Sequence, residues 1–343
     1  MDLAACFEQS PVLLMEAALG TRLKQEYGLS FDGPVAMADL VLSDAGRGAL
    51  RSLWLEYAGI ARKYGLPFLA TTPTRRANRE RMREAGYLGK ERDSRSAAAG
   101  VGLFAENAAL IREVMREVTG EKVCQTEEGA AFPAGMYVGG LMGCRGDAYT
   151  GEGAIASVEE ARAFHSWQAQ ALADAGVDFL LAGIMPTLTE ARGMALAMAE
   201  TGLPYVISFT VLAGGTLVDG TPIHNAIERI DAAAGHANCC APLCYMSNCV
   251  HPETLLLALD APCNRTELVR RRFGGIQANA SKLSLAALDT LAGTCTAHED
   301  SPEELAAGML RLHRQYGLRI LGGCCGTTGR HLEAIARAAA AEM

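Results

Sequence analysis

The stretch VDFLLAGIMPTLTEARGMALAMAETGLPYVISFT (residues 177–210) decides the fold class. It contains two continuous apolar runs, at 177–185 and 204–210, separated by a helix-like segment at 187–202. Apolar runs that do not alternate with polar residues are expected where both faces of a strand are covered, as in a parallel sheet. The stretch therefore predicts a strand–helix–strand unit with parallel strands.

Six further apolar runs repeat this pattern along the chain. They lie at residues 11–16, 66–72, 132–140, 241–249, 273–281 and 319–323. Helix-like segments lie between the runs; two of them, at 157–176 and 301–317, begin with Ser157 and Ser301, each followed at the third position by a glutamate, as in a capping box. Eight strands that alternate with helices predict an α/β fold, a single (β/α)8 TIM barrel, in one domain over residues 1–343.

An open, doubly wound sheet is the alternative for such a chain. Sheets of that kind often carry a GxGxxG turn after the first strand or a GxxxxGK[ST] phosphate loop. Neither motif follows the first apolar run or any other. The barrel is therefore the favoured architecture.

The composition excludes several classes of protein. Of the 343 residues, 50% are hydrophobic and 20% are charged, and the net charge is −8, which argues against disorder and against nucleic acid or an anionic membrane as partner. No run of 18 apolar residues occurs, and the start MDLAACFEQS has no basic region, so we expect neither a membrane span nor a signal peptide. The eleven cysteines, an odd number, indicate a reducing compartment, and we expect a cytoplasmic protein.

Three cysteines fall where the active site of a barrel is expected, at the C-terminal ends of strands. Cys249 ends the sixth apolar run, and Cys324 and Cys325 follow the eighth. Three thiolates with an open fourth position suit a catalytic zinc ion. Buried packing or a redox pair are the alternatives at this stage. His251 and His331 each stand where a helix begins, so we interpret them as capping residues and not as a fourth ligand.

The motif GGCCGT (322–327) followed by HLEAIA (331–336), together with NC (248–249) at an earlier strand end, resembles the homocysteine S-methyltransferase family. Weaker similarities are EAALGTRL (16–23), TTPTRRA (71–77) and GCRGDAYTGE (143–152). The resemblance implies a (β/α)8 barrel whose Zn²⁺ is held by Cys249, Cys324 and Cys325, which take part in catalysis through the metal.

The resemblance also implies the reaction: transfer of a methyl group from a sulfonium, ammonium or corrinoid donor to a zinc-bound thiol, homocysteine or a different thiol, as in methionine metabolism. The partners are then a small-molecule thiol acceptor and a methyl donor, with no nucleic acid and no membrane; a homo-oligomer stays open. The implied substrate-binding positions are Glu16, Thr72, Arg75, Gly183 and Asn279.

Departures from the family pattern gather at these positions. Glu16 and Gly183 stand where the family has an aspartate and a glutamate that bind the homocysteine ammonium. Glu16 can still bind an ammonium group, but Gly183 cannot. Either another carboxylate such as Glu190 supplies the missing charge and homocysteine stays the acceptor, or the acceptor is a different thiol, with Arg75 favouring an anionic group, or the chain is a non-catalytic zinc- or thiol-binding barrel. Asn279 has a simpler alternative as a hydrogen-bonding residue at a strand end.

Overall fold

Eight parallel strands close into a barrel in the order β1 to β8 in the computed structural model of the chain. The strands are β1 (Leu13–Met15), β2 (Phe68–Thr71), β3 (Met136–Gly143), β4 (Phe179–Met185), β5 (Tyr205–Phe209), β6 (Cys244–Val250), β7 (Phe273–Ala278) and β8 (Ile320–Gly323). The structure describes residues 2–88, 94–120, 135–237, 239–282 and 299–343, with the backbone alone for 94–101. The predicted (β/α)8 barrel is confirmed; residues 132–134 of the predicted third strand lie outside the described residues.

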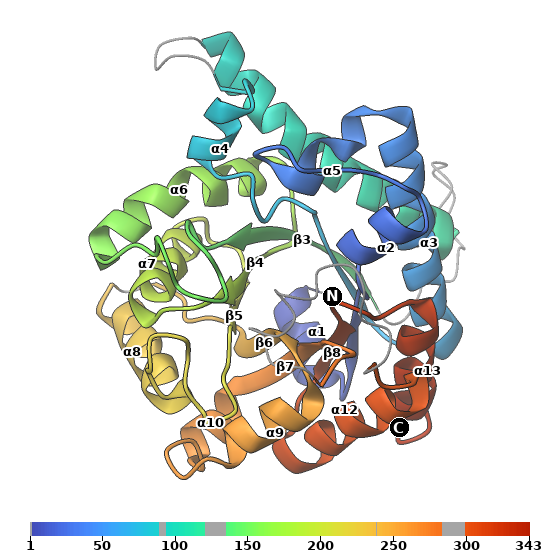
Figure 1. Ribbon diagram of the computed structural model, residues 1–343, viewed down its shortest axis with the longest axis vertical. Coiled ribbons are helices and arrows are strands. Elements are labelled where there is room, and N and C mark those ends of the chain that lie inside the picture. The colour runs from blue at the N-terminus through green and yellow to red at the C-terminus, as the bar shows by residue number, and fades with distance from the viewer. Residues whose placement is uncertain (1, 89–93, 121–134, 238, 283–298) are drawn as a thin grey trace.

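Most of the helices in the described ranges form a ring around the strands, and α1 lies across the centre of this ring (Figure 1). These helices are α1 (Leu3–Gln9), α2 (Gly20–Gln25), the 3₁₀ helix η1 (Ala36–Leu42), α3 (Asp44–Tyr64), α4 (Arg79–Glu84), α5 (Ser94–Thr119), α6 (Val158–Asp174), α7 (Leu188–Ala199), α8 (Ile223–His236), α9 (Pro252–Asp260), α10 (Glu267–Arg272), α12 (Pro302–Tyr316) and α13 (Gly329–Ala340). None of the helices in the described ranges is both long and apolar enough to cross a bilayer.

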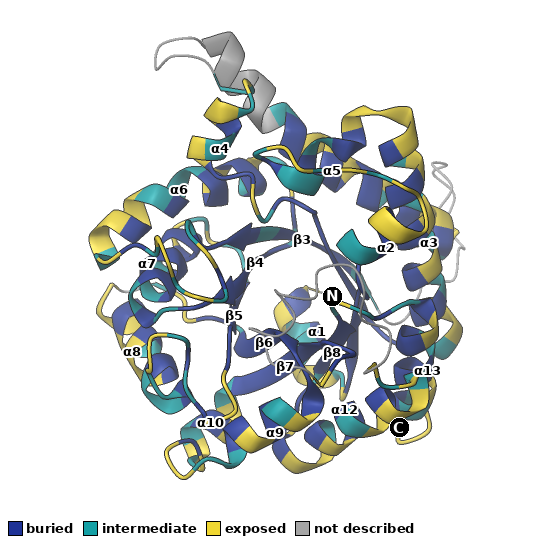
Figure 2. Ribbon diagram, viewed as in Figure 1, coloured by how far each residue is buried: buried dark blue, intermediate teal, exposed yellow. Residues whose placement is uncertain are grey.

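The strands are buried on both faces, which explains their continuous apolar sequence (Figure 2). All seven residues of β4 and all seven of β6 are buried. One face of each strand packs against the ring of helices, and the other points into the barrel. A parallel barrel buries both faces of its strands. The continuous apolar runs within residues 177–210 are therefore a consequence of this fold.

The predicted helix starts agree with the structure. Ser301 accepts a hydrogen bond from Glu304 N, and the Glu304 carboxylate accepts one in return from Ser301 N, which completes a capping box. Ser157 accepts a bond from Glu160 N, the first half of the same motif. His251 is the N-cap of α9, and His331 accepts a bond from Thr328 N at the start of α13. The capping interpretation of both histidines is confirmed.

The inside of the barrel is filled by a separate apolar cluster. Residues from seven strands contribute to it, among them Leu13, Met15, Phe179, Leu181 and Met246. Helix α1 packs against this cluster through Leu3 and Cys6, which are 3% and 2% exposed. Because the chain enters β1 directly after α1, this helix covers the N-terminal end of the barrel, and Figure 1 shows it across the centre of the ring.

Gly139 in β3 tests how tightly this interior is packed. A Cβ atom at this position would lie 2.4 Å from Cζ of Phe179, so a side chain forces the ring or the strand to move. We expect Gly139→Val to lower the free energy of unfolding by about 1–3 kcal/mol in urea titrations. Gly235→Ala is the control, because this exposed α8 position has open space and the change is expected to stabilise by about 0.5–1 kcal/mol. Equal effects of the two variants would contradict the packing described here.

Candidate metal centre at the C-terminal rim of the barrel

Three cysteine sulfurs lie together at the C-terminal rim of the barrel. Sγ of Cys325 lies 3.7 Å from Sγ of Cys249 and 4.0 Å from Sγ of Cys324. Cys249 and Cys324 form a disulfide, with their Cα atoms 5.5 Å apart. The adjacent cysteines Cys324 and Cys325 are therefore not bonded to each other. In the described part of the chain, this is the group of three side chains that could hold a metal ion.

The end of β6 is distorted in a way that directs Cys249 toward the other two cysteines. The pairing with β7 shifts between Asn248 and Val250, which marks an irregularity of the β-bulge type. Cys249 has a φ of 53°, a left-handed conformation that is uncommon for residues other than glycine. Bulges and strained residues of this kind re-aim side chains at functional sites.

A tight turn after β8 presents the other two cysteines. Thr327 N donates to the carbonyl of Cys324 at 3.1 Å, and the Thr327 hydroxyl donates to the same oxygen at 2.6 Å. Gly326 has a φ of 76° at the third position of this turn, where a side chain would be strained. The glycine after the two cysteines is thus required by the turn, and the turn leaves Cys325 exposed.

The chemistry of this donor set fits zinc. Zinc binds thiolates at about 2.3 Å in a tetrahedron, so ligating sulfurs lie about 3.8 Å apart. The two non-bonded separations, 3.7 and 4.0 Å, are close to this value. Because a metal binds thiolates, the Cys249–Cys324 disulfide and a metal ion are alternative states of the same cluster.

Glu16 lies beside this rim, directly after β1, in a network of hydrogen bonds. Some residues of this network were not predicted from the sequence. The Glu16 carboxylate accepts hydrogen bonds from the Thr71 hydroxyl at 2.5 Å, from Thr71 N at 3.2 Å and from Gln277 Nε2 at 3.4 Å. Gln277 in turn accepts a bond from Nδ2 of Asn248, the residue before Cys249. Burial raises the pKa of Glu16 to about 7.

Gln277 and Asn248 escaped the sequence analysis because each is one polar residue within an apolar run. The available signal was strand alternation, since these two positions share the inward face with Met246. The side-chain oxygen of Asn248 and the hydroxyl of Ser208 on β5 are buried without a hydrogen-bond partner in the described structure. The C-terminal rim thus carries a polar layer above the apolar interior.

Arg75 and Gly183 lie on the other side of the rim. Arg75 follows β2, and its side chain lies against Gly143 at the end of β3, where a Cβ would come within 2.5 Å of its Cγ. Gly143 pairs with Gly183 of β4. Burial of its sulfur raises the pKa of the Cys325 thiol, and the nearby Arg75 guanidinium offsets part of this rise.

Two other predicted substrate-binding residues, Thr72 and Asn279, form hydrogen bonds within the protein. Thr72 is fully buried, and its hydroxyl accepts a bond from Leu141 N and lies 2.8 Å from the Thr74 hydroxyl. Asn279 is 2% exposed, and its side-chain oxygen accepts a bond from Ser281 N at 2.9 Å. The strand-end interpretation of Asn279 agrees with this contact.

Glu190 does not supply a carboxylate to the rim. It is fully buried in α7, where its carboxylate accepts bonds from Arg145 N at 2.7 Å and Ile155 N at 3.2 Å and lies 3.0 Å from Nε2 of His165. These contacts hold the segment between β3 and α6. The idea that Glu190 replaces the missing carboxylate of Gly183 is therefore wrong, because both oxygens already have partners.

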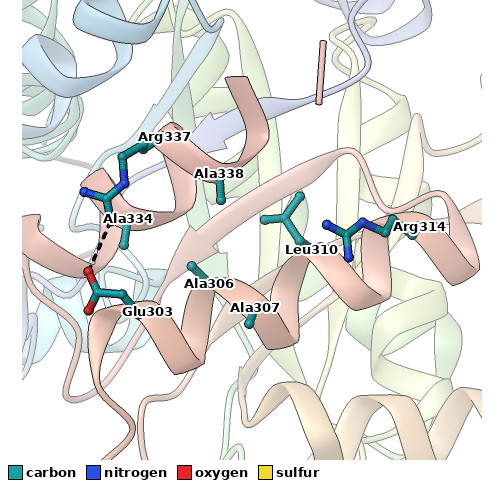
Figure 3. A pocket seen from close by; sticks show the side chains of 8 residues that line it. All are labelled: Glu303, Ala306, Ala307, Leu310, Arg314, Ala334, Arg337 and Ala338. Atoms are coloured by element: carbon teal, nitrogen blue, oxygen red, sulfur yellow. Dashed lines mark hydrogen bonds and ion pairs between the residues drawn. The ribbon is translucent and has the colours of Figure 1, made fainter. Parts of the chain in front are cut away.

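A surface cavity of about 270 Å³ lies away from the cysteines, between α12 and α13. Figure 3 shows its lining, with the Glu303–Arg337 ion pair at one end and Arg314 at the other. Its floor is formed by alanines and Leu310. It carries no cysteine or histidine, so the candidate metal centre is a separate feature.

Comparison with known proteins agrees with this geometry. The sequence model of the homocysteine S-methyltransferase family matches residues 13–339. The chain belongs to the homocysteine S-methyltransferase family. It is 25% identical over 338 residues to homocysteine S-methyltransferase of Escherichia coli strain K12, covering 97% of both chains, and 29% identical over 209 residues to homocysteine S-methyltransferase YbgG of Bacillus subtilis, covering 60% of this chain and 58% of that protein.

Solved structures of a homocysteine methyltransferase share the fold. The oxidized form of MmuM from Escherichia coli superposes with a TM-score of 0.70 at 22% identity, covering 98% of both chains. Its metallated form gives a TM-score of 0.68 at 22% identity, covering 97% of this chain and 98% of that one. The barrel fold agrees with membership of the homocysteine S-methyltransferase family. The chain is accordingly a methyltransferase.

Burial of Glu16 in this homocysteine S-methyltransferase barrel has a consequence for stability. Between the ordinary glutamate pKa of 4.5 and the raised pKa of about 7, the folded protein retains a proton that the unfolded chain releases. Stability therefore falls as pH rises through this window. We expect Glu16→Gln to gain about 2 kcal/mol relative to the wild type between about pH 5 and about pH 7.5, measured by urea unfolding. A difference that does not change with pH would contradict the raised pKa.

Proposed function

We propose that this chain is a zinc-dependent S-methyltransferase that moves a methyl group from a sulfonium, ammonium or corrinoid donor to a thiol held at the cysteine cluster. The observation that carries the proposal is the gathering of three sulfurs, from the ends of β6 and β8, within 4.8 Å of one another. Cys249, Cys324 and Cys325 would hold the Zn²⁺. Strands from both ends of the chain, β1 and β8, border this site, which supports one domain over residues 1–343.

The metal would supply one chemical function. Zinc bound by three thiolates lowers the pKa of a thiol in its fourth position and keeps it ionised at neutral pH. The protein supplies orientation: the β6 irregularity and the Gly326 turn fix the directions of the cysteine side chains. Cys324 and Cys325 are only partly buried, so the cluster is accessible to small molecules.

The reaction is a displacement at the methyl carbon. The acceptor sulfur forms a bond to this carbon while the bond between carbon and the sulfonium or ammonium atom of the donor breaks. The electron pair of the broken bond stays with the donor, and the thiol proton passes to solvent. A sulfonium or ammonium donor leaves as a neutral thioether or amine, whereas a corrinoid donor would lose the methyl group from cobalt and keep the pair on the metal, which is reduced by two electrons. Holding acceptor and donor in line is the main contribution of the protein.

Replacing any one cysteine of the cluster by serine should abolish turnover and weaken zinc binding. A hydroxyl is a harder and less acidic ligand than a thiol, so the donor set loses its match to zinc. The measurements are zinc content after dialysis and transfer of a labelled methyl group. Cys240→Ser is the matched control, because this exposed thiol precedes β6 at the opposite end of the barrel and should leave both unchanged. Full activity in Cys325→Ser would contradict the proposal.

Calorimetric titration of homocysteine into the zinc-loaded protein tests acceptor binding without a choice of donor. If the thiol binds at the metal as thiolate, the heat should depend on the ionisation enthalpy of the buffer, because a proton is released. Binding without methyl transfer from any sulfonium, ammonium or corrinoid donor would instead indicate a non-catalytic thiol-binding barrel.

A further inference from the structure

Arg75 is an unpaired positive charge at the rim of the barrel. No ion pair joins its guanidinium to a carboxylate within the described ranges of the chain. Arginine carries its charge at every physiological pH and binds carboxylates through two parallel hydrogen bonds. A guanidinium without an internal partner beside an exposed reactive cluster is available to a ligand.

The position of Arg75 is fixed by close packing. Its side chain lies against Gly143: a Cβ atom added to this glycine would lie 2.5 Å from Cγ and 3.3 Å from Cδ of Arg75. Gly143 and its neighbour Gly183 share the inward face of β3 and β4 with Leu141 and Leu181, since side chains alternate along a strand. The Arg75 side chain therefore lies over the inward position of Gly143, and the adjacent inward position, Gly183, also has no side chain.

Among the described residues, no group around Arg75 forms an ion pair with it. Arg76 and Arg81 lie near it, and repulsion among the three adds to burial in lowering the pKa of the latter two. Cys144 is also near, but burial raises the pKa of its thiol to about 11, so it is neutral. Asp147 is a nearby carboxylate whose pKa is lowered mainly by hydrogen bonds to one of its oxygens from Thr150 N, Tyr149 N and Thr150 Oγ1, and to a smaller extent by the Arg75 charge.

Among the described residues, Glu16 and Glu299 are carboxylates on the elements that border the cysteine cluster. Glu16 is occupied by Thr71 and Gln277, as described above. Glu299, before α12, lies beside Gly326, where a Cβ atom would stand 2.8 Å from its Oε1, whereas Arg75 lies against Gly143 at the end of β3. Negative charge is therefore near the β7–β8 side of the cluster, and positive charge comes from the β2–β3 side.

We propose that Arg75 binds an anionic oxygen group of the acceptor thiol, so that the acceptor is a thiol carrying a carboxylate or a similar oxyanion. The proposal rests on the proposed function, because it takes the acceptor sulfur to bind at the cysteine cluster. Gly143 contributes to the arrangement, because its lack of a side chain leaves the space that the Arg75 side chain occupies. Arg75 acts here as a specificity-determining residue.

Four thiols with different charges test this proposal by calorimetric binding to the zinc-loaded protein. The probes are 3-mercaptopropionate (anionic), 2-mercaptoethanol (neutral), cysteamine (cationic) and homocysteine (zwitterionic). One charge-assisted pair is worth about 1.5–3 kcal/mol, so 3-mercaptopropionate should bind about 10–100-fold more tightly than 2-mercaptoethanol. Arg75→Gln should remove this preference and leave 2-mercaptoethanol binding within about threefold.

Matched variants separate charge from position. Arg76→Gln removes the same charge from the next, exposed residue and should change 3-mercaptopropionate binding by less than about threefold. Gly143→Ala retains Arg75 but displaces its side chain, and should also weaken 3-mercaptopropionate selectively. A Cβ at Gly183 would lie 2.8 Å from the flexible end of Leu141 and in ordinary contact with Met142 O at 3.5 Å. Gly183→Glu should shift the preference toward cysteamine, whereas Gly183→Gln should not.

The outcomes distinguish this proposal from the proposed function. Equal binding of charged and neutral thiols, or an unchanged preference in Arg75→Gln, overturns the role of Arg75 and leaves the methyltransferase proposal intact. Tighter binding of cysteamine than of 3-mercaptopropionate by the wild type also overturns it. If none of the four thiols binds the zinc-loaded protein, both proposals fail together.

Discussion

Closure of the parallel barrel is the constraint on which the cysteine cluster depends. Strand β7 lies between β6 and β8 in the sheet, so the two outer strands would normally be separated by two strand spacings, about 9–10 Å. The Cα atoms of Cys249 and Cys324 are nevertheless only 5.5 Å apart. Strand β7 ends at Ala278, and the chains leaving β6 and β8 bend over its end.

The rim where this happens differs from the rest of the barrel in its backbone and in its polarity. Cys249 and Ile184 are two of the non-glycine residues with positive φ, and both stand where the pairing of β6 or β4 is irregular. Below the rim the barrel is regular and apolar. Backbone strain at the rim is thus supported by a rigid interior, which is the arrangement expected of a functional site.

The fold could be predicted from the sequence because burial of both strand faces leaves a direct pattern. All eight apolar runs contain a strand, but the bounds differ: β3 extends to Gly143 beyond the predicted end at 140, β6 begins at Cys244 and not at 241, and β7 ends at Ala278 and not at 281. The cysteine positions were predictable from strand ends and from family resemblance. The contacts of Glu16, Gln277 and Arg75 were not, because they join residues far apart in sequence through side-chain geometry. The same reason explains the wrong suggestion for Glu190, whose partners come from two other segments.

Helix α1 covers the N-terminal end of the barrel with Leu3 and Cys6 packed into the interior. This short helix precedes the first strand in sequence, yet its side chains belong to the core inside the barrel. The interior beneath the cysteine cluster is therefore filled with apolar side chains down to the N-terminal end, and the polar groups described above are confined to the C-terminal rim. The N-terminal segment is thus part of the packing that supports the candidate metal centre from below, although it lies at the opposite end of the strands.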